Sequence, residues 1–393
     1  MNNSLINRTM TASIEGVFKY LPIITLTGPR QSGKTTLCRK VFSHLPYTNL
    51  EDAATLAEVR FDPKAFLAKH PQGVIIDEAQ NYPAIFSYLQ VAVDEDRMNG
   101  GNRHFVVTGS NNLSLMQQIT QSMAGRTAVM SLLPLSTEEI LTAYPHVKTS
   151  EMLLCGGYPA IWANGLDSRR IILSNYYTTY IERDVRSLVN LKDLQAFQMF
   201  IRLAAGRIGQ EFNASSLSVE VGVSAPTIKN WISVLCASYV LYLMKPYYAN
   251  IGKRLTKAPK LYFYDTGLAS YLLGINTVEQ MDVHPLRGNL FENMVVNDML
   301  KHGVNRGQEH SLFFYRDKSQ REVDILRLLP DNRLEAYEIK SGMTFNTDYF
   351  KHLHYLQSLL GERIARTAVI YDGNQENNQP IDGYCNFRHL SLE

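Results

Sequence analysis

Short apolar runs recur through the first third of the chain, and consecutive runs are separated by enough residues to form a helix. The runs at residues 23–26, 74–76 and 105–107 are rich in β-branched and aliphatic side chains, which is typical of strands buried on both faces. Residues 35–42 have the pattern of a helix, and residues 129–135 have that of a further strand. This alternation predicts an α/β domain built on a parallel sheet.

After residue 135 the pattern becomes helical. Within residues 136–191, the side chains of Tyr176, Tyr177 and Tyr180 recur at helical spacing. The spacing predicts an amphipathic helix that packs an aromatic face against the rest of the protein.

Residues 217–231 follow the apolar pattern of a helix-turn-helix. Gly222 lies at the turn, and Ser224 can cap the second helix. Residues 240–245 then alternate like a strand, so this part of the chain predicts a winged helix. On the exposed side of the second helix we expect Thr227, Lys229 and Asn230.

Composition adds the general class of the protein. The 393 residues are 45% apolar and 19% charged, as in an ordinary globular protein, and no stretch approaches the roughly 18 apolar residues of a membrane-spanning helix. The N-terminus has no signal-peptide pattern. The cysteines are far apart in the sequence and read as free thiols in a reducing compartment, so we expect a cytoplasmic protein without a membrane partner; they are Cys38, Cys155, Cys236 and Cys385.

The distribution of charge is more informative than the net charge of +2. Residues 192–262 contain nine Lys or Arg against three Asp or Glu, which gives this segment a charge of +6. The predicted winged helix lies in this segment, so it is the best candidate for contact with DNA phosphates. A structural or regulatory role for the winged helix is the alternative.

The first motif with chemical meaning follows the run at 23–26. Its octet GPRQSGKT fits G-x-x-x-x-G-K-[ST], the phosphate-binding loop between a strand and a helix. We expect backbone N–H groups to bind phosphate, Lys34 to reach the β- and γ-phosphates, and the Thr35 hydroxyl to ligate Mg²⁺. The expected nucleotide-binding residues are Gly28, Pro29, Arg30, Gln31, Ser32, Gly33, Lys34, Thr35 and Thr36.

The second motif is the acidic pair Asp77-Glu78 after the run at 74–76. Parallel α/β sheets bind ligands at the carboxyl ends of their strands, where this pair lies. We expect Asp77 to hold Mg²⁺ and Glu78 to act as the general base that activates water for attack on the γ-phosphate. A solvated Glu78 at a helix start is the alternative.

A third constellation lies near the C-terminus. Two alternating runs flank a turn at 330–332, which predicts a hairpin with Asp324 opposite Glu338 and with Lys340 on the same face as Glu338. The two carboxylates, with Glu292 from the preceding helix, could hold Mg²⁺, and the lysine could activate water for phosphodiester cleavage. The spacing D-x13-E-x-K resembles the restriction-endonuclease-like nuclease core. The polar face of an antiparallel sheet is the alternative.

Together these segments make the chain similar to a family of prokaryotic AAA-type P-loop ATPases with a C-terminal domain of unknown function. The resemblance covers nearly the whole length, and its segments are GPRQSGKTT, VIIDEAQ, VVTGSNN, AGR, LPLSTEEI, GGYPA, TTYIERDV, YFYDTGL, GNLFEN, EVDI and EIKS. It implies a bacterial or archaeal protein that uses ATP and forms homo-oligomers. The expected α/β architecture has four parts: a parallel-sheet AAA-type core (1–135), a helical lid (136–191), a winged-helix region (192–260) and a restriction-endonuclease-like domain (261–393).

The resemblance also assigns roles near the third apolar run. In AAA-type ATPases a polar residue at the end of this strand senses the γ-phosphate, and Ser110, or else Asn111, is the candidate. A strand cap or turn is an equal alternative for either residue. Arg126 could be an arginine finger toward a neighbouring subunit or a phosphate contact within the chain. The simpler interpretation is a surface arginine paired with a carboxylate.

The expected function is Mg²⁺-dependent ATP hydrolysis coupled to DNA binding, with nucleic-acid cleavage left open. One alternative is a nucleotide-switched interaction protein, of a defence or toxin–antitoxin type, whose nuclease-like domain is inactive. Another is a DNA-binding regulator that uses the winged helix alone.

Overall fold

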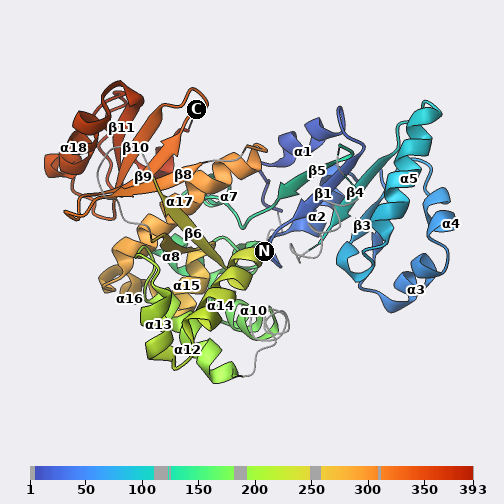
Figure 1. Cartoon of the computed structure of the whole chain (residues 1–393), viewed down its shortest axis with the longest axis horizontal. Helices are drawn as coiled ribbons and strands as arrows, with labels where there is room; N and C mark the ends of the chain where they lie inside the picture. Colours follow the sequence, from blue (N-terminus) through green and yellow to red (C-terminus); the bar gives the residue numbers. More distant parts are fainter. Residues whose placement is uncertain are drawn as a thin grey trace.

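The computed structural model describes residues 5–109, 123, 125–180, 193–247, 258–308 and 311–392. One end of the molecule is a parallel sheet with its helices, the other end is a mixed sheet, and a helical region lies between them (Figure 1). In the described parts of the chain, no helix combines the length and apolarity needed to cross a membrane.

The N-terminal sheet has five parallel strands in the order β2-β3-β4-β1-β5. The strands predicted from the three apolar runs are confirmed as β1 (Ile23–Thr27), β3 (Gly73–Asp77) and β4 (His104–Thr108); β2 (Tyr47–Asn49) and β5 (Thr127–Ser131) are the edges. Since β4 lies between β1 and β3, the phosphate-binding loop and Asp77 share one edge of the sheet with the end of β4 between them. The helices of this part are α1 (Thr11–Val17), α2 (Lys34–Val41), α3 (Ala53–Phe61), α4 (Pro63–Ala68) and α5 (Ile85–Met98).

Both faces of this sheet are buried. Ile24 and Leu26 of β1 pack with α1 and α2, whereas Ile23 of β1 and Val74 of β3 pack with α4 and α5. Side chains alternate across a strand, so the unbroken apolar runs in the sequence reflect burial on two sides.

The central helices form one aromatic core. Tyr176 is fully buried, and its ring centroid lies 4.7 Å from that of Tyr158 and 5.2 Å from that of Tyr180. The predicted aromatic helix face is therefore part of the interior. The elements of this region are α7 (Thr137–Ala143), α8 (Thr149–Cys155), α9 (Pro159–Asn164), α10 (Arg169–Tyr176) and α12 (Leu194–Ala205).

The helix-turn-helix pattern corresponds to α13 (Ala214–Val221) and α14 (Ala225–Ala237). Gly222 adopts φ 79° between them, and the Ser224 side chain accepts a hydrogen bond from the backbone N–H of Thr227, as expected of a turn and a cap. An antiparallel pair follows, β6 (Leu241–Pro246) and β7 (Lys260–Phe263).

This strand pair joins the C-terminal sheet, whose order is β12-β11-β10-β9-β8-β6-β7. The predicted boundary between residues 260 and 261 thus falls inside β7, because the strand pair of the helix-turn-helix region and the C-terminal strands make one sheet. The other strands are β8 (Leu312–Arg316), β9 (Glu322–Leu328), β10 (Leu334–Lys340), β11 (Ile364–Tyr371) and β12 (Gly383–Asn386).

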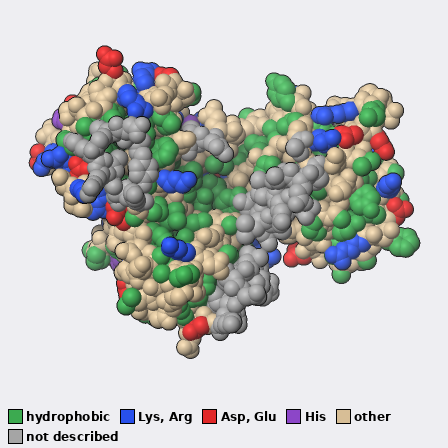
Figure 2. Space-filling view, viewed as in Figure 1, with side chains coloured by type: hydrophobic (Ala, Val, Ile, Leu, Met, Phe, Trp, Pro, Cys, Tyr) green, Lys and Arg blue, Asp and Glu red, His purple; other side chains and the backbone are tan. Residues whose placement is uncertain are grey.

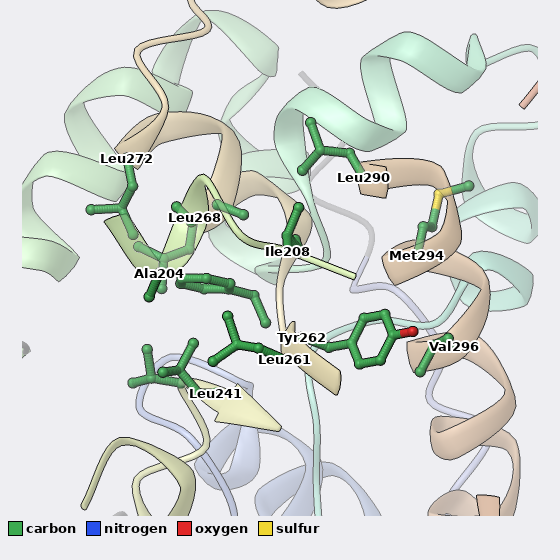
Figure 3. Close-up of a cluster of buried hydrophobic side chains, with 14 of the residues drawn as sticks. Ala204, Ile208, Leu241, Leu261, Tyr262, Leu268, Leu272, Leu290, Met294 and Val296 are labelled. Atoms are coloured by element: carbon green, nitrogen blue, oxygen red, sulfur yellow. The ribbon is translucent and has the colours of Figure 1, made fainter. Parts of the chain in front are cut away.

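Helices cover both faces of the C-terminal sheet. The neighbouring residues Val369 and Ile370 of β11 point to opposite sides and pack in different clusters, one with α18 (Lys351–Leu360) and one with α17 (Arg287–Asn305). Figure 3 shows the apolar cluster in which α17 meets β6, β7 and α15 (Thr266–Leu272), with the Tyr262 hydroxyl directed toward α17. The helix α16 (Val278–Val283) precedes α17.

The long helix α17 connects the two ends of the molecule. Near its C-terminus, Lys301 Nζ donates to the Leu135 carbonyl at 2.8 Å and Asn305 Nδ2 donates to Thr9 Oγ1 at 2.7 Å. A second contact between distant segments is made by Asp265. Its buried carboxylate accepts hydrogen bonds from the backbone N–H of Gly157 at 2.6 Å and of Leu268 at 2.9 Å. These bonds account for the aspartate of the YDTGL segment, and the glycines are needed for close packing, since a Cβ at Gly156 would lie 2.3 Å from the Asp265 carboxylate and one at Gly267 would lie 2.4 Å from the Cys155 carbonyl.

Candidate functional site

The phosphate-binding loop joins β1 to α2 in the conformation its glycines allow. Gly28 has φ 137°, and a Cβ at this position would lie 2.3 Å from the carbonyl oxygen of Leu132. Gly33 has φ 93° and precedes the first turn of α2. The loop therefore depends on glycine at 28 for close backbone packing and at 33 for left-handed backbone geometry.

Lys34 is buried at the centre of the loop. Its Nζ atom donates to the carbonyl oxygens of Gly28 at 3.0 Å and Pro29 at 2.8 Å. Burial lowers the pKa of the Lys34 amino group to about 8, although Glu78 and Asp77 oppose this shift.

Asp77 lies at the end of β3, and side chains from three other elements donate hydrogen bonds to its carboxylate. Its Oδ2 atom accepts from Thr35 Oγ1 of α2 at 2.7 Å and from the Tyr47 hydroxyl of β2 at 2.8 Å, and its Oδ1 atom accepts from Thr108 Oγ1 of β4. Desolvation raises the pKa of the Tyr47 hydroxyl, and the hydrogen bond to the Asp77 carboxylate raises it further. The oxygens of Thr35 and Asp77 that the sequence assigns to Mg²⁺ are thus adjacent, and they fit a hard cation that binds oxygen ligands.

Glu78 follows Asp77 in left-handed backbone geometry, at φ 55°. Non-glycine residues seldom adopt this conformation, which costs free energy and is found most often at functional sites. The Gln80 side-chain amide donates to Glu78 Oε2 and fixes the carboxylate, and Glu78 lines the cavity described next.

A cavity of about 720 Å³ opens beside the loop, which is ample for a nucleotide. The loop and α2 form its polar wall through Arg30, Gln31, Gly33, Lys34, Thr35 and Thr36. Other lining residues come from the N-terminal segment, the end of α7 and α9, and they include Leu5, Ile6, Tyr144, Pro159, Ala160 and Ala163. Ser32 is fully buried, and its Oγ atom has no hydrogen-bond partner among the described residues.

Arg8 holds the N-terminal segment against the loop. Its guanidinium donates to the Ser32 carbonyl at 2.7 Å, to the Leu133 carbonyl at 2.6 Å and to Glu139 Oε1 at 3.1 Å. The sequence analysis missed Arg8 and Tyr47, because no motif surrounds them, and it missed Thr108, because only Ser110 and Asn111 were singled out in the VVTGSNN segment. Only the arrangement of strands brings them to the loop and to Asp77.

The two other predicted site positions are the γ-phosphate sensor and Arg126, and the structure describes only the second. Ser110 and its alternative Asn111 lie outside the described residues. Arg126 precedes β5 at the sheet edge opposite the loop, where its backbone pairs with Ile23 and its guanidinium contacts Asp94 at 2.8 and 2.9 Å. This position does not favour a phosphate contact within the same chain, and the carboxylate pairing agrees with the simpler interpretation.

Fewer basic side chains of residues 192–262 are free at the surface than their count in the sequence suggests. Lys260 is buried, and Arg207 pairs with Glu220. On the face seen in Figure 2, Lys and Arg side chains are spread over both ends of the molecule. Exposed basic residues in this segment include Arg202, Lys229 and Lys245, and four others lie outside the described residues: Lys192, Lys253, Arg254 and Lys257.

The C-terminal carboxylates come together as the hairpin pattern predicts. The antiparallel register pairs Tyr337 with Ile325, so the next pair is Glu338 with Asp324, and the backbone N–H of Ile339 donates to Asp324 Oδ2 at 2.8 Å. Lys340 Nζ contacts Glu338 Oε1 at 2.5 Å. Burial, with a contribution from Asp324, raises the pKa of Glu338 to about 8.

Lys260 of β7 is a further member of this cluster that the sequence analysis did not identify. Its Nζ atom lies 3.0 Å from Glu292 Oε1, 2.5 Å from Glu322 Oε1 and 3.8 Å from Asp324 Oδ1. Among the described residues, no group of three or more His, Cys, Asp or Glu side chains could hold a metal ion. The expected Mg²⁺ site of Glu292, Asp324 and Glu338 therefore does not fit this arrangement, because an ammonium group lies among the carboxylates.

Comparison with protein families divides the chain into three parts. Residues 21–141 match the family described as AAA domain, so the N-terminal sheet and its loop are a P-loop domain of the AAA type. Residues 147–279 and 287–390 match two different families, each described as a domain of unknown function. The winged helix and the restriction-endonuclease-like fold remain predictions.

Relatives that match most of the chain include the following two. An uncharacterized protein of Mycobacterium tuberculosis is 28% identical over 372 residues, which are 93% of this chain and 80% of the relative. An uncharacterized protein of Haemophilus influenzae is 26% identical over 302 residues, which are 71% of this chain and 69% of the relative.

Similar solved structures align with low scores. The Walker-type ATPase PABY2304 of Pyrococcus abyssi aligns at a TM-score of 0.42 and 14% identity, covering 69% of this chain and 99% of that one. The Orc1 protein of Aeropyrum pernix in complex with DNA aligns at a TM-score of 0.29 and 14% identity, covering 68% and 92%. Scores at this level carry no argument about function.

Proposed function

We propose that this protein binds and hydrolyses ATP. The observation that carries the proposal is the convergence of Thr35, Tyr47 and Thr108 on the Asp77 carboxylate, beside a cavity lined by the phosphate-binding loop. These oxygens come from four separate elements, and a purely structural role would not explain why a nucleotide-sized cavity opens next to them.

The residues of the chain divide the chemistry among them. Backbone N–H groups of the loop bind the phosphates. The Lys34 ammonium group exchanges its hydrogen bonds to the Gly28 and Pro29 carbonyls for contacts with the β- and γ-phosphates. Mg²⁺, held by Thr35 and through Asp77, would neutralise charge on those phosphates. Glu78 orients and deprotonates the attacking water, and Gln80 keeps its carboxylate in place. The apolar side chains of α9 and the N-terminal segment enclose the base.

Two variants test these roles in the full-length protein. Lys34→Ala should lose ATP binding, because it removes the ammonium group that the loop motif places at the β- and γ-phosphates. Glu78→Gln should keep ATP binding and lose turnover by a factor of about 100 or more, since it removes only the base. Binding is measured by equilibrium titration and turnover by phosphate release. Normal hydrolysis by Glu78→Gln would contradict the assignment of Glu78 as the general base.

We also propose that nucleotide binding acts on α14, the second helix of the helix-turn-helix. The Tyr239 hydroxyl at the end of α14 lies 3.1 Å from Thr27 Oγ1, next to the loop, and 2.9 Å from Ser131 Oγ. In parallel, Arg30 of the loop lies over the Tyr180 ring, and the Tyr180 hydroxyl donates to the Ser238 carbonyl at 3.0 Å. Two contacts therefore join the loop to the end of α14.

The exposed side of α14 supports DNA as the partner of this helix. Lys229 and Asn230 are exposed there, as expected of a helix that contacts nucleic acid. Lys229→Ala should weaken DNA binding and lower the slope of log K against log salt by about one, whereas the exposed Lys69→Ala on the N-terminal domain should change neither. Equal behaviour of the two variants in fluorescence anisotropy would count against DNA contact through α14.

A second candidate function is a nucleotide-switched interaction protein with an inactive nuclease-like domain. The position of Lys260 among the C-terminal carboxylates favours it over metal-dependent cleavage. Such a protein would assemble or bind a partner in an ATP-dependent way, and it would not cleave DNA. Homo-oligomers, with Arg126 facing a neighbouring subunit, belong to this proposal and are tested by light scattering with and without a non-hydrolysable ATP analogue.

A further inference from the structure

The carboxylate cluster at the C-terminal sheet contains its own cation. Lys260 lies on β7 with only 1% of its surface exposed, and a buried ammonium group is strongly disfavoured unless it is paired. Its partners come from two other elements, Glu292 from α17 and both Glu322 and Asp324 from β9. One lysine thus compensates carboxylates that would otherwise repel one another.

Several other carboxylate oxygens of the cluster also have partners, whereas Glu338 Oε2 is buried and has no hydrogen-bond partner among the described residues. Glu292 Oε1 accepts from the Tyr262 hydroxyl at 2.5 Å, and Glu322 Oε2 lies 3.3 Å from the Arg316 guanidinium. Asp324 Oδ2 accepts a backbone N–H, and Glu338 Oε1 is taken by Lys340. A divalent cation would need several of these oxygens at once, and it would have to displace protein donors to obtain them.

The same residues fasten α17 to the edge of the sheet. Next to Glu292, the Asn293 side chain accepts from the backbone N–H of Phe263 and donates to its carbonyl, at 2.8 and 3.0 Å. Asn293 thereby satisfies both backbone groups of Phe263 at the end of β7, which is the last strand in the order of the sheet. Glu292, Asn293, Lys260 and Tyr262 form one continuous contact between α17 and β7.

From this geometry we infer that Lys260 occupies the place of a divalent metal and that the cluster is a metal-independent joint between α17, β7 and β9. The cluster therefore does not serve as a Mg²⁺-dependent nuclease centre. The inference rests on contacts of the C-terminal sheet alone and is independent of the proposed ATP chemistry.

The test measures Mn²⁺ binding and thermal unfolding of the full-length, nucleotide-free protein. For the wild type we expect no Mn²⁺ bound at the cluster, so Asp324→Asn should leave the Mn²⁺ titration unchanged, and added Mn²⁺ should not change Tm through it. Lys260→Met removes the internal cation at similar volume. It should lower Tm by several degrees, and Mn²⁺ should restore part of this loss, because the carboxylates then lack a counter-charge.

A matched variant controls for the loss of a buried cation. Arg327 pairs with Glu335 at 2.6 Å in the same sheet, and both side chains are buried. Arg327→Met should also lower Tm, but Mn²⁺ should not restore it, because only one carboxylate is left without its partner.

Three outcomes would overturn the inference. The first is a Mn²⁺ ion bound by the wild type and lost in Asp324→Asn. The second is Mg²⁺-dependent DNA cleavage by the wild type that Asp324→Asn abolishes. The third is a Lys260→Met variant as stable as the wild type. The first two need no Lys260 variant, so they remain decisive even if that variant fails to fold, and none depends on ATP hydrolysis.

Discussion

At the scale of single residues, the phosphate-binding loop combines backbone geometry with a buried charge. Gly28 allows the loop to pass the carbonyl of Leu132, and Lys34 lies in a site where burial lowers its pKa. In the proposed function both features suit an anion: Gly28 shapes the backbone of the loop, and the buried Lys34 ammonium group would gain from a phosphate partner.

Gly28→Ala should disrupt the loop. A methyl group would meet the Leu132 carbonyl at 2.3 Å, and φ 137° is itself unfavourable for alanine, so we expect a loss of at least about 1–3 kcal/mol and loss of ATP binding. Gly16→Ala is the control, because no atom lies within 4 Å of its added Cβ and it lies in helix α1. Urea denaturation should show Gly16→Ala to be neutral or stabilising, and equal losses for the two variants would contradict this explanation.

The affinity for ATP should depend on pH through Lys34. Its pKa in the free protein is lowered to about 8, so the amino group is charged below pH 8 and becomes neutral above it. Phosphate binding favours the charged form, so Kd for ATP should rise as the pH increases from 7 to 9, and binding near pH 8.5 should take up a proton. Calorimetry in buffers of different ionisation enthalpy measures this uptake. A Kd that is flat over this range would contradict it.

At the scale of elements, α17 shows how a helix can complete the edge of a sheet. Besides its pairing with β6, β7 bonds the segment at Gly209 and Gln210 through the backbone of Leu261, and at its end the Asn293 amide bonds both backbone groups of Phe263. The GNLFEN segment of the sequence is therefore explained by docking of a helix, without any need for catalysis.

Asn293→Ala should weaken this docking. It leaves one buried N–H group without its partner and removes one of the donors to the Phe263 carbonyl, so we expect a loss of about 2 kcal/mol in the free energy of unfolding. The exposed Asn276→Ala should change it by less than about 0.5 kcal/mol. Chemical denaturation compares the two variants, and equal stability would argue that α17 is held by its apolar contacts alone.

At the scale of the whole molecule, the nucleotide domain and the C-terminal sheet are linked through the helical region. Helix α17 contacts the N-terminal segment and Leu135, and Tyr239 connects the end of α14 to β1 and β5. Domains joined by such specific polar contacts can respond together to a ligand only if the contacts differ between bound and free states.

Tyr239→Phe tests this coupling. It removes one hydroxyl and keeps the ring, so the fold should remain, while the factor by which DNA changes Kd for ATP should fall toward one. The measurement is a nucleotide titration with and without DNA, for the wild type and the variant. An unchanged factor would place the coupling elsewhere, for example at Tyr180.

The sequence predicts the motif-bearing elements well, because their signals are local. Buried parallel strands leave apolar runs, the loop needs glycines at fixed spacing, and the turn of the helix-turn-helix needs Gly222 and Ser224. The register of the hairpin was also accessible, since a short loop fixes it, and the observed pairing of Tyr337 with Ile325 is the one that this loop implies.

Other features could not be predicted, because they depend on elements far apart in the chain. Tyr47 and Arg8 carry no motif, yet strand order and the return of the N-terminal segment bring them to the nucleotide site. Lys260 counted in the sequence as one more basic residue for DNA, and only the pairing of β7 beside β6 places it among the carboxylates.

The sequence by itself determined that the chain carries a phosphate-binding-loop motif and an acidic pair, from which Lys34, Thr35 and Asp77 are predicted to carry the chemistry, since each signal lies within one short local segment. Only the tertiary structure decided what faces those residues and what charge lies in the C-terminal cluster. The physical reason is that charge compensation in a buried site depends on distances between side chains from different elements, and spacing along the chain does not fix those distances.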